Sequence, residues 1–277
     1  MKIAIIGHGF VGKAVDYGFN RSKIEKIIID PNRGTKIEDL VGQDIGASFI
    51  CVPTPMGEDG SIDSSIVESC VMFLKQNVTG HIIIKSTVTP NILRKLITGP
   101  SGHRIVYNPE FLTEKSANED FVNPKMHVFG GDKETTDQVE KLYHKYSSCK
   151  PCPVYHMTPE EASFVKYGIN SFLASKVLWF NQFYDIVEDF GSNYGTIINA
   201  IATDSRVGPS HTSVPGFDNK RGYGGACFPK DTAAFLKFSN KTFTVLEEVI
   251  RRNNDYRKVY EKDDREKVQN VNYNLET

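Results

Sequence analysis

A cysteine that directly follows a glycine-rich run is the residue of this chain with the most reactive side chain. Cys227 comes after Gly222–Ala226 and shortly before Lys230 and Asp231. Glycines let a backbone approach a ligand closely, and a nearby cation favours the thiolate, which is a strong nucleophile. The segment therefore predicts an activated cysteine in a tight loop. The segment alone is equally compatible with a glycine-rich turn that holds a buried, inert thiol.

Lys166 and Asn170 form a second candidate group, four positions apart in a stretch with helical periodicity. Side chains at this spacing share one face of a helix. A cation and an amide on one face could bind a substrate oxygen or a developing oxyanion. The alternative is a solvated polar face with no chemical role.

The amino-terminal residues have the pattern of a dinucleotide-binding unit. An apolar run, Lys2–Ile6, precedes Gly7–Gly12, which reads Gly-His-Gly-Phe-Val-Gly. A helical stretch, Lys13–Phe19, and a second apolar run, Ile27–Asp30, follow. This order of strand, glycine-rich turn, helix, strand and acid is typical of dinucleotide-binding domains.

Each residue type in this pattern has a physical reason. Gly7 would allow the tight turn, Gly9 would let the backbone reach a pyrophosphate, and Gly12 would let the helix pack on the sheet. Free N–H groups at the helix start would bind the phosphates. Asp30 would accept hydrogen bonds from a ribose and repel a 2′-phosphate, so the sequence predicts NAD rather than NADP.

The composition favours a two-domain globular protein. The 277 residues carry a formal net charge of −1, which gives no basic field for nucleic acid. No apolar stretch is long enough for a membrane span, and no signal peptide precedes the first strand. The odd number of cysteines without a secretory signal predicts a reduced, cytoplasmic setting; they are Cys51, Cys70, Cys149, Cys152 and Cys227.

The pair Cys149 and Cys152 has the spacing of a metal or redox motif. Without a second pair or a histidine cluster in the sequence, we expect no zinc and no other metal site. A redox role stays open, and a loop with two incidental cysteines is the favoured interpretation.

Alternating strands and helices predict a parallel sheet in the first half of the chain. Ligands bind at the carboxyl ends of the strands in such sheets. Thr54, Thr87 and Glu110 follow expected strands and belong on that side, although residues there are often only turn formers. The further expected strands are Ser48–Val52, Ile82–Lys85, Arg104–Tyr107 and Met126–Phe129, and a helical pattern covers Asp63–Gln76.

The second half of the chain is predicted to be helical. Thr158, Pro159 and Glu161 are a helix start, and one long helix should run to about Phe190. Further helices are expected over 194–202, 231–238 and 244–261, with an ordered functional loop over 204–230. We thus expect a Rossmann-type α/β domain over 1–157, an all-α domain over 158–260 and a charged tail over 261–277 that frays.

Taken in order, these motifs resemble the UDP-glucose/GDP-mannose 6-dehydrogenase family, with UDP-glucose 6-dehydrogenases the most similar branch. The resemblance runs from Met1 to about Arg257. The segments that carry it are Gly7–Gly12, Val52–Pro55, Lys85–Val88, Asn108–Glu114, Lys166 with Asn170, Asp204–Gly208 and Gly222–Asp231.

The resemblance implies a four-electron oxidation of the C6 alcohol of a nucleotide sugar with two NAD. Cys227 would form a thiohemiacetal and then a thioester, while Lys166 and Asn170 stabilise the oxyanions. Thr87 and Glu114 would hold and deprotonate the hydrolytic water, Asp231 would orient that water or Lys166, and Glu110 would be a second acid. The implied cofactor-binding residues are Gly7, Gly9, Phe10, Val11, Gly12, Asp30, Thr54, Pro55, Thr87, Glu114 and Lys230. The implied substrate-binding residues are Glu110, Phe111, Leu112, Thr113, Glu114, Lys166, Asn170, Arg206, Tyr223 and Gly224.

By the same resemblance the long helix is the core of a homodimer. Members of the family carry a further carboxy-terminal domain that closes over the nucleotide, and this chain stops early in what resembles the connecting helix. We therefore expect weak binding of nucleotide sugars unless a partner supplies the missing surface.

Alternatives remain for the substrate and the reaction. UDP-glucose is the first candidate and GDP-mannose the second. A β-hydroxyacid-type dehydrogenase would share the first domain and the lysine–asparagine pair, but it performs one oxidation and needs no cysteine. A catalytically weak NAD-binding remnant is the alternative outside the enzymes.

Overall fold

The computed structural model describes residues 1–21, 23–99 and 102–275. The chain forms two compact units. Unit 1 comprises Met1–Thr54 and Asp63–Lys166, and unit 2 comprises Pro55–Ile62 and the chain from Tyr167 on. The boundary lies inside the long helix, whereas the sequence led us to expect it at the start of that helix.

A seven-stranded sheet forms the centre of unit 1, in the order β2-β1-β3-β4-β5-β6-β7. Neighbouring strands pair in parallel, except that β5 and β6 are antiparallel. The strands are β1 Lys2–Ile6, β2 Glu25–Ile29, β3 Ala47–Ile50, β4 His81–Ile84, β5 Ile105–Tyr107, β6 His127–Gly130 and β7 Val154–Met157. The expected fold class is confirmed, with one antiparallel pairing added to it.

Strand β7 is the one strand of this sheet that the sequence analysis missed. Its residues Val-Tyr-His-Met alternate too briefly to give a strand signal, and three of its four residues are only half-buried. An edge strand has a neighbour on one side only, so it needs less apolar sequence than a central strand.

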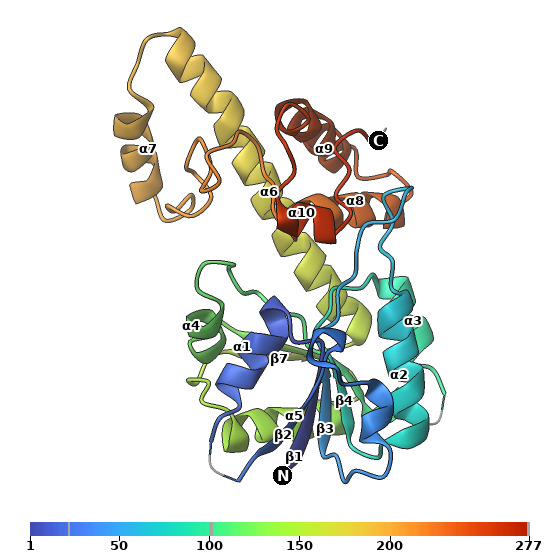
Figure 1. The fold of residues 1–277 in the computed structure, drawn as a ribbon. Coiled ribbons are helices and arrows are strands. Elements are labelled where there is room, and N and C mark those ends of the chain that lie inside the picture. Colours follow the sequence, from blue (N-terminus) through green and yellow to red (C-terminus); the bar gives the residue numbers. More distant parts are fainter. Residues whose placement is uncertain (22, 100–101, 276–277) are drawn as a thin grey trace. The chain divides into compact units, whose positions relative to one another are not determined.

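Alternating side chains of the central strands build a core on each face of the sheet. Ile3 and Ile5 of β1 point to one face, and Ala4 and Ile6 point to the other. Helices α1, α4 and α5 cover the first face, and α2 and α3 cover the second (Figure 1). These helices are α1 Phe10–Gly18, α2 Ser65–Asn77, α3 Pro90–Ile97, α4 Ala117–Val122 and α5 Lys133–Tyr146, with short 3-10 turns at Pro31–Arg33, Ile37–Leu40 and Gly102–Arg104.

The long helix α6, Pro159–Asp189, has 31 residues. The backbone N–H of Thr158 donates to Glu161 Oε2 at 2.8 Å, and the backbone N–H of Glu161 donates back to Thr158 Oγ1 at 3.3 Å. This reciprocal cap satisfies N–H groups that the helix itself cannot. The predicted helix start is therefore confirmed residue by residue.

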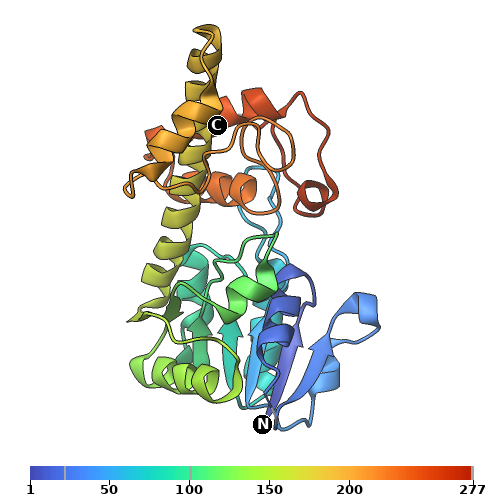
Figure 2. The ribbon, with the colours of Figure 1, turned by 90° about the vertical axis from the view of Figure 1, so that its left-hand side faces the viewer.

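Four further helices belong to unit 2. Helix α7 lies beside the carboxy-terminal half of α6 (Figures 1 and 2). Phe180, Val187 and Tyr194 form the core between these two helices. A second core, which contains Leu178 and Leu246, joins α8 and α9 to α6. The helices are α7 Tyr194–Thr203, α8 Phe228–Phe238, α9 Thr244–Arg257 and α10 Asp264–Val268.

The segment after Glu261 packs instead of fraying, so that expectation was wrong. Asp263 caps the short helix α10 by accepting from the backbone N–H of Glu266 at 3.0 Å. Val271 and Tyr273 are buried, and the backbone N–H of Met56 donates to the carbonyl of Gln269 at 2.9 Å. The charged composition of this segment led us to expect a solvent-exposed tail, but Glu266 is fully buried although it is a charged residue.

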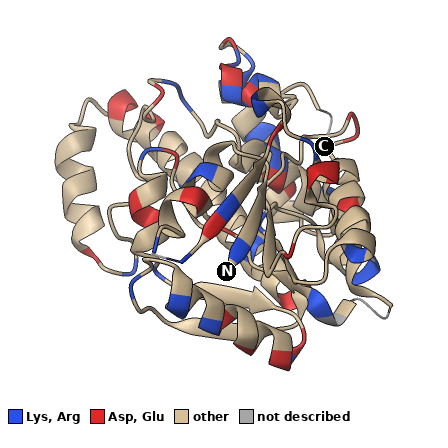
Figure 3. Cartoon of the chain, turned by 60° about the horizontal axis from the view of Figure 1, so that its bottom comes forward, with Lys and Arg blue, Asp and Glu red and all other residues tan. Residues whose placement is uncertain are grey.

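Charges of both signs are interspersed in the view of Figure 3, and neither sign forms a continuous stripe there. This agrees with the formal net charge of −1. Within the described ranges, the search for a helix with the length and apolar character of a membrane span finds none.

Candidate active site

The glycine-rich turn after β1 has the backbone geometry that its sequence predicts. Gly7 has a φ of +86°, and a Cβ there would lie 2.7 Å from the carbonyl oxygen of Cys51. A Cβ on Gly12 would lie 1.9 Å from the carbonyl oxygen of Gly7, so the turn and the helix need both glycines. A Cβ on Gly9 would meet nothing within 4 Å, which leaves the backbone there open to a ligand.

The start of helix α1 fits a bound pyrophosphate. Gly9 is the N-cap and provides no side-chain hydrogen bond, and the first turn carries no acidic residue. Phe10 and Val11 begin the helix, so their backbone N–H groups lie at its positive end. An anion is therefore the natural partner of this helix end.

Asp30 lies directly after β2 and is fixed by backbone donors. Its Oδ2 accepts from the N–H of His8 at 2.6 Å, and its Oδ1 accepts from the N–H of Asn32 at 2.9 Å. The hydrogen bond from His8 holds the pKa of Asp30 below its usual value, against the opposing effect of burial. The carboxylate is thus charged at neutral pH and has lone pairs left for ribose hydroxyls.

Further predicted residues follow the next strands of the sheet. Thr54 follows β3 and Thr87 follows β4, and both are buried. Ser86 Oγ donates to the carbonyl of Val52 at 2.6 Å, and this hydrogen bond joins the loop after β3 to the loop after β4. Pro55 begins the short segment that belongs to unit 2.

Glu110 and Lys166 form a buried pair within unit 1. Lys166 Nζ lies 3.1 Å from Glu110 Oε1 and donates to the Glu110 carbonyl at 2.7 Å. Glu110 Oε2 accepts from the backbone N–H of Leu112 at 2.7 Å. Both charged side chains are less than a tenth exposed, and Lys166 lies over the ring of Phe111. Two predicted site residues far apart in sequence are therefore brought together.

Sequence reasoning missed a buried network that supports this pair. Lys85 Nζ donates to Asn108 Oδ1 at 2.9 Å, and the Tyr143 hydroxyl donates to the same oxygen at 2.7 Å. Burial lowers the pKa of Lys85 to about 8. Because Asn108 precedes Pro109 and Glu110, this network fixes the turn that presents Glu110. The sequence signals were the position of Asn108 directly after a strand and the place of Lys85 and Asn108 in two segments that carry the family resemblance.

Cys227 is the N-cap residue of helix α8, and the backbone N–H of Asp231 donates to its carbonyl at 2.9 Å. The positive end of a helix stabilises a thiolate. The Cys227 side chain is half-buried, and none of the five cysteines is in a disulfide.

A buried polar cluster surrounds Asp231, one turn into α8. Asn170 Nδ2 donates to Asp231 Oδ2 at 2.6 Å, and Lys230 Nζ lies 2.6 Å from Asp231 Oδ1. All three residues are less than a tenth exposed. The carboxylate thereby orients an amide and a cation, and its partners in this cluster are Asn170 and Lys230, where the resemblance had suggested Lys166 or water.

The other predicted site residues differ in burial and in the contacts that they make. The side chain of Arg206 is 88% exposed and pairs with Asp204, with Nη2 2.6 Å from Oδ2. Thr113 and Glu114 are exposed, and Thr113 binds Asp120. Tyr223 is buried and Gly224 is half-buried, four and three residues before the cysteine.

Comparisons with known proteins cover both units. Residues 41–147 match the NAD-binding domain of the UDP-glucose/GDP-mannose dehydrogenase family, and residues 160–255 match its central domain. The chain is 29% identical over 92% of its length to UDP-glucose 6-dehydrogenase TuaD of Bacillus subtilis, and 34% identical over 76% of its length to a UDP-glucose 6-dehydrogenase of Rickettsia bellii. It spans 63% and 49% of those two proteins.

Among solved structures, the chain is similar to a UDP-glucose dehydrogenase from the archaeon Pyrobaculum islandicum. The TM-score is 0.76 at 26% identity, over 92% of this chain and 68% of the archaeal chain. The similarity therefore includes the sheet domain and the helical region after it.

Proposed function

Because the chain belongs to the UDP-glucose/GDP-mannose dehydrogenase family, we propose that it oxidises the C6 alcohol of a nucleotide sugar to a carboxylate. UDP-glucose is the first candidate substrate and GDP-mannose the second. The observation that carries the proposal is Cys227 at the N-cap of α8, one turn before the buried Asp231 cluster. A single oxidation of an alcohol would need no such thiol.

The cofactor would be NAD, which accepts a hydride in each oxidation. The open backbone at Gly9 and the start of α1 support binding of its pyrophosphate. The charged Asp30 supports binding of an unphosphorylated ribose.

The proposed reaction has four steps. The C6 alcohol loses a hydride and a proton and becomes an aldehyde. The Cys227 sulfur then forms a bond to C6, the π bond of the aldehyde breaks, and the thiol proton passes to the aldehyde oxygen, which gives a thiohemiacetal. A second hydride passes from C6 to a second NAD as the hydroxyl proton leaves, which gives a thioester. Water then attacks C6, the carbon–sulfur bond breaks, and the carboxylate and the free thiol are released.

The remaining predicted catalytic residues have matching roles in the proposal. Asn170 and Lys166 would stabilise the oxyanion of each tetrahedral stage. Asp231 would fix the Asn170 amide, which it binds at 2.6 Å. Glu110 and Thr87 would hold the hydrolytic water, with Glu114 as the base that the family resemblance suggests.

We also propose that two copies of the chain associate through α6. Phe172, Trp179 and Ile186 recur every seven residues on this helix and are 67%, 55% and 66% exposed. Residues at this spacing lie on nearly the same face of a helix. An apolar face of this kind is typical of a surface that a partner covers.

The first experiment is to measure NADH formed per UDP-glucose consumed, for the native chain and for Cys227→Ser. We expect two NADH per sugar for the native chain and no completed turnover for the variant. One NADH per sugar in both proteins would instead indicate a single-oxidation dehydrogenase. No NADH with UDP-glucose or GDP-mannose, while NAD still binds, would favour an NAD-binding remnant.

A further inference from the structure

Two side chains from distant parts of unit 2 hold the backbone just before Cys227. Asn253 of α9 accepts from the N–H of Tyr223 at 2.7 Å and donates to its carbonyl at 3.0 Å. Glu266 of α10 accepts from the N–H of Gly225 at 3.1 Å. The loop is therefore bound by residues of both α9 and α10, and the contact at Gly225 lies two residues before the cysteine.

Glu266 is fully buried, and both of its carboxylate oxygens accept hydrogen bonds. Its Oε1 lies 2.6 Å from Arg257 Nη2 and accepts from the Tyr273 hydroxyl at 2.6 Å. Its Oε2 accepts from the backbone N–H of Asp263 at 3.0 Å. A buried carboxylate with this many donors stays charged and fixed in place.

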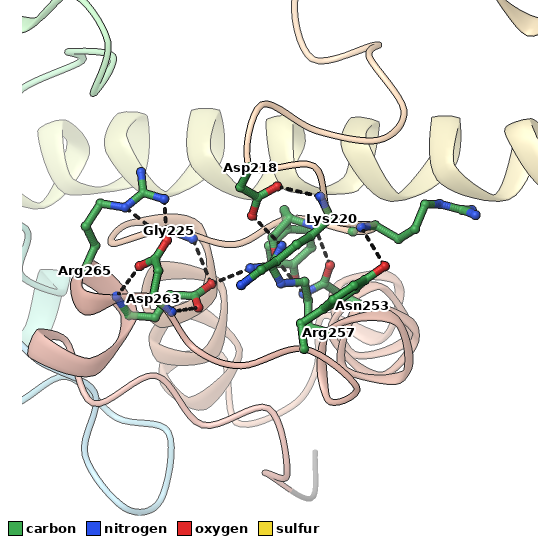
Figure 4. A network of polar contacts seen from close by, with 12 residues as sticks. Asp218, Lys220, Gly225, Asn253, Arg257, Asp263 and Arg265 are labelled. Atoms are coloured by element: carbon green, nitrogen blue, oxygen red, sulfur yellow. Dashed lines mark hydrogen bonds and ion pairs between the residues drawn. The ribbon is translucent and has the colours of Figure 1, made fainter.

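Arg257 links the same carboxylate to the other end of the loop. It is 1% exposed, and its Nη1 lies 2.7 Å from Asp218 Oδ2 (Figure 4). Asp218 precedes the glycine-rich run, and Glu266 binds within that run. The Arg257 guanidinium thus pairs with two carboxylates, that of Asp218 before the glycine-rich run and that of Glu266, which binds within the run.

The glycines of the loop allow this close support. A Cβ on Gly224 would lie 2.2 Å from Arg257 Nη2 and 2.5 Å from Glu266 Oε1. Gly222, with a φ of +73°, would place a Cβ 2.5 Å from Asn253 Oδ1. The glycine run that the sequence suggested for close approach to a ligand is therefore packed, at these two positions, against the protein's own polar side chains.

We propose that Glu266 is a positioning residue for Cys227, so that the carboxy-terminal segment sets the place of the thiol. Residues 256–275 lie beyond the part of the chain that matches the central domain of the family, and they contribute Arg257, Glu266 and Tyr273 to this support. The inference rests on the proposed function in that Cys227 is taken to be the nucleophile. The physical support of the loop can be measured without any turnover.

The test uses the full chain with Glu266→Gln, and Asp264→Asn as the matched control. Asp264 lies on the same helix with its side chain 99% exposed, so the control makes the same chemical change outside the network. In Glu266→Gln, we expect hydrogen exchange at the Gly225 amide to accelerate about tenfold, because its acceptor is weakened. The control should exchange like the native chain.

Alkylation by iodoacetamide reports the thiol itself. We expect Cys227 to react several-fold faster in Glu266→Gln, while the buried Cys51 and Cys70 stay protected. Protection of these two thiols shows that unit 1 of the variant is folded, and native hydrogen exchange of the α9 amides shows the same for unit 2. If either control fails, Tyr273→Phe decides, since it removes one donor to Glu266 and leaves the charges paired; we expect the same changes in smaller measure.

Turnover provides the last measurement. We expect kcat to fall about tenfold in Glu266→Gln with KM for NAD unchanged, because only the thiol is displaced. Exchange, alkylation and kcat equal to those of Asp264→Asn would overturn the proposal, and so would altered exchange with native kcat. If the native chain makes no NADH but exchange and alkylation change as expected, the proposed function fails and the support of Cys227 by Glu266 stands.

Discussion

At the scale of single residues, Asp30 is expected to decide the choice of cofactor. Its carboxylate is charged because backbone N–H groups bind it, and a 2′-phosphate would meet that charge at short range. Asp30→Asn should weaken NAD binding by about tenfold, since it removes a charged acceptor for the ribose. The ratio of the affinities for NAD and NADP should also become smaller.

Isothermal titration with each dinucleotide checks this expectation. Asp44→Asn is the control, because Asp44 is an exposed carboxylate of the same unit. An unchanged ratio of the two affinities in Asp30→Asn would refute the assigned role.

Asn170 is expected to matter more for the rate than for binding. An amide nitrogen has two N–H groups, and Asp231 accepts one of them, which leaves the other for an oxyanion. Asn170→Ala should lower kcat by about 10²–10³-fold, as removal of an oxyanion donor does. KM should change little, since the oxyanion exists only after substrate is bound.

Steady-state kinetics with Asn199→Ala as the control test this expectation. Asn199 is exposed on α7, and its change removes an amide from elsewhere in unit 2. Lys230 still pairs with Asp231 in Asn170→Ala, so the melting temperature should stay close to that of the native chain. A rise in KM with normal kcat would instead make Asn170 a substrate-binding residue.

At the scale of elements, α10 is expected to detach in acid. Burial acts to raise the pKa of Glu266, but hydrogen bonds from Tyr273 and the Asp263 N–H, with the charge of Arg257, hold it below its ordinary value. A carboxyl with a lowered pKa stabilises the folded state above its unfolded pKa of about 4.3, and this stabilisation is lost as pH falls through the folded pKa.

Hydrogen exchange of α10 between pH 3 and 7 measures this loss, after correction for the intrinsic rates. The native chain and Asp264→Asn should both lose protection as the pH falls below about 4.3. Glu266→Gln should show little of this pH dependence, because its side chain does not titrate. Equal pH dependence in all three proteins would assign the acid sensitivity to other carboxyl groups.

At the scale of the whole molecule, the apolar face of α6 is expected to hold two copies together. A charge placed at Phe172 would have to be buried in such an interface, at a cost of several kcal/mol. Phe172→Glu should therefore give a monomer where the native chain is a dimer. Light scattering measures the mass directly.

Tyr155→Glu is the matched control, because Tyr155 is an exposed aromatic residue on strand β7 in unit 1. It should leave the native mass unchanged. A native chain that is monomeric at every concentration, or a Phe172→Glu protein that remains dimeric, would remove α6 from the interface.

Several features of the fold could be predicted because they depend on residues that are close together in the chain. The glycine spacing of Gly7–Gly12, the cap of α6 at Thr158 and the apolar runs of the sheet are encoded within a few residues of one another. Backbone sterics and hydrogen bonding act at that range, so pattern alone predicted six strands, the long helix and the phosphate-binding turn.

The pairing of charged and polar groups in the interior depends on the folded chain. Glu110 meets Lys166, Asn170 meets Asp231, and Arg257 meets Glu266. The first two pairs join segments far apart in the chain, and none of the three has a spacing that a sequence pattern could reveal. Burial makes each pairing necessary, because a charge removed from water must find a partner, and only the folded chain specifies which partner is near.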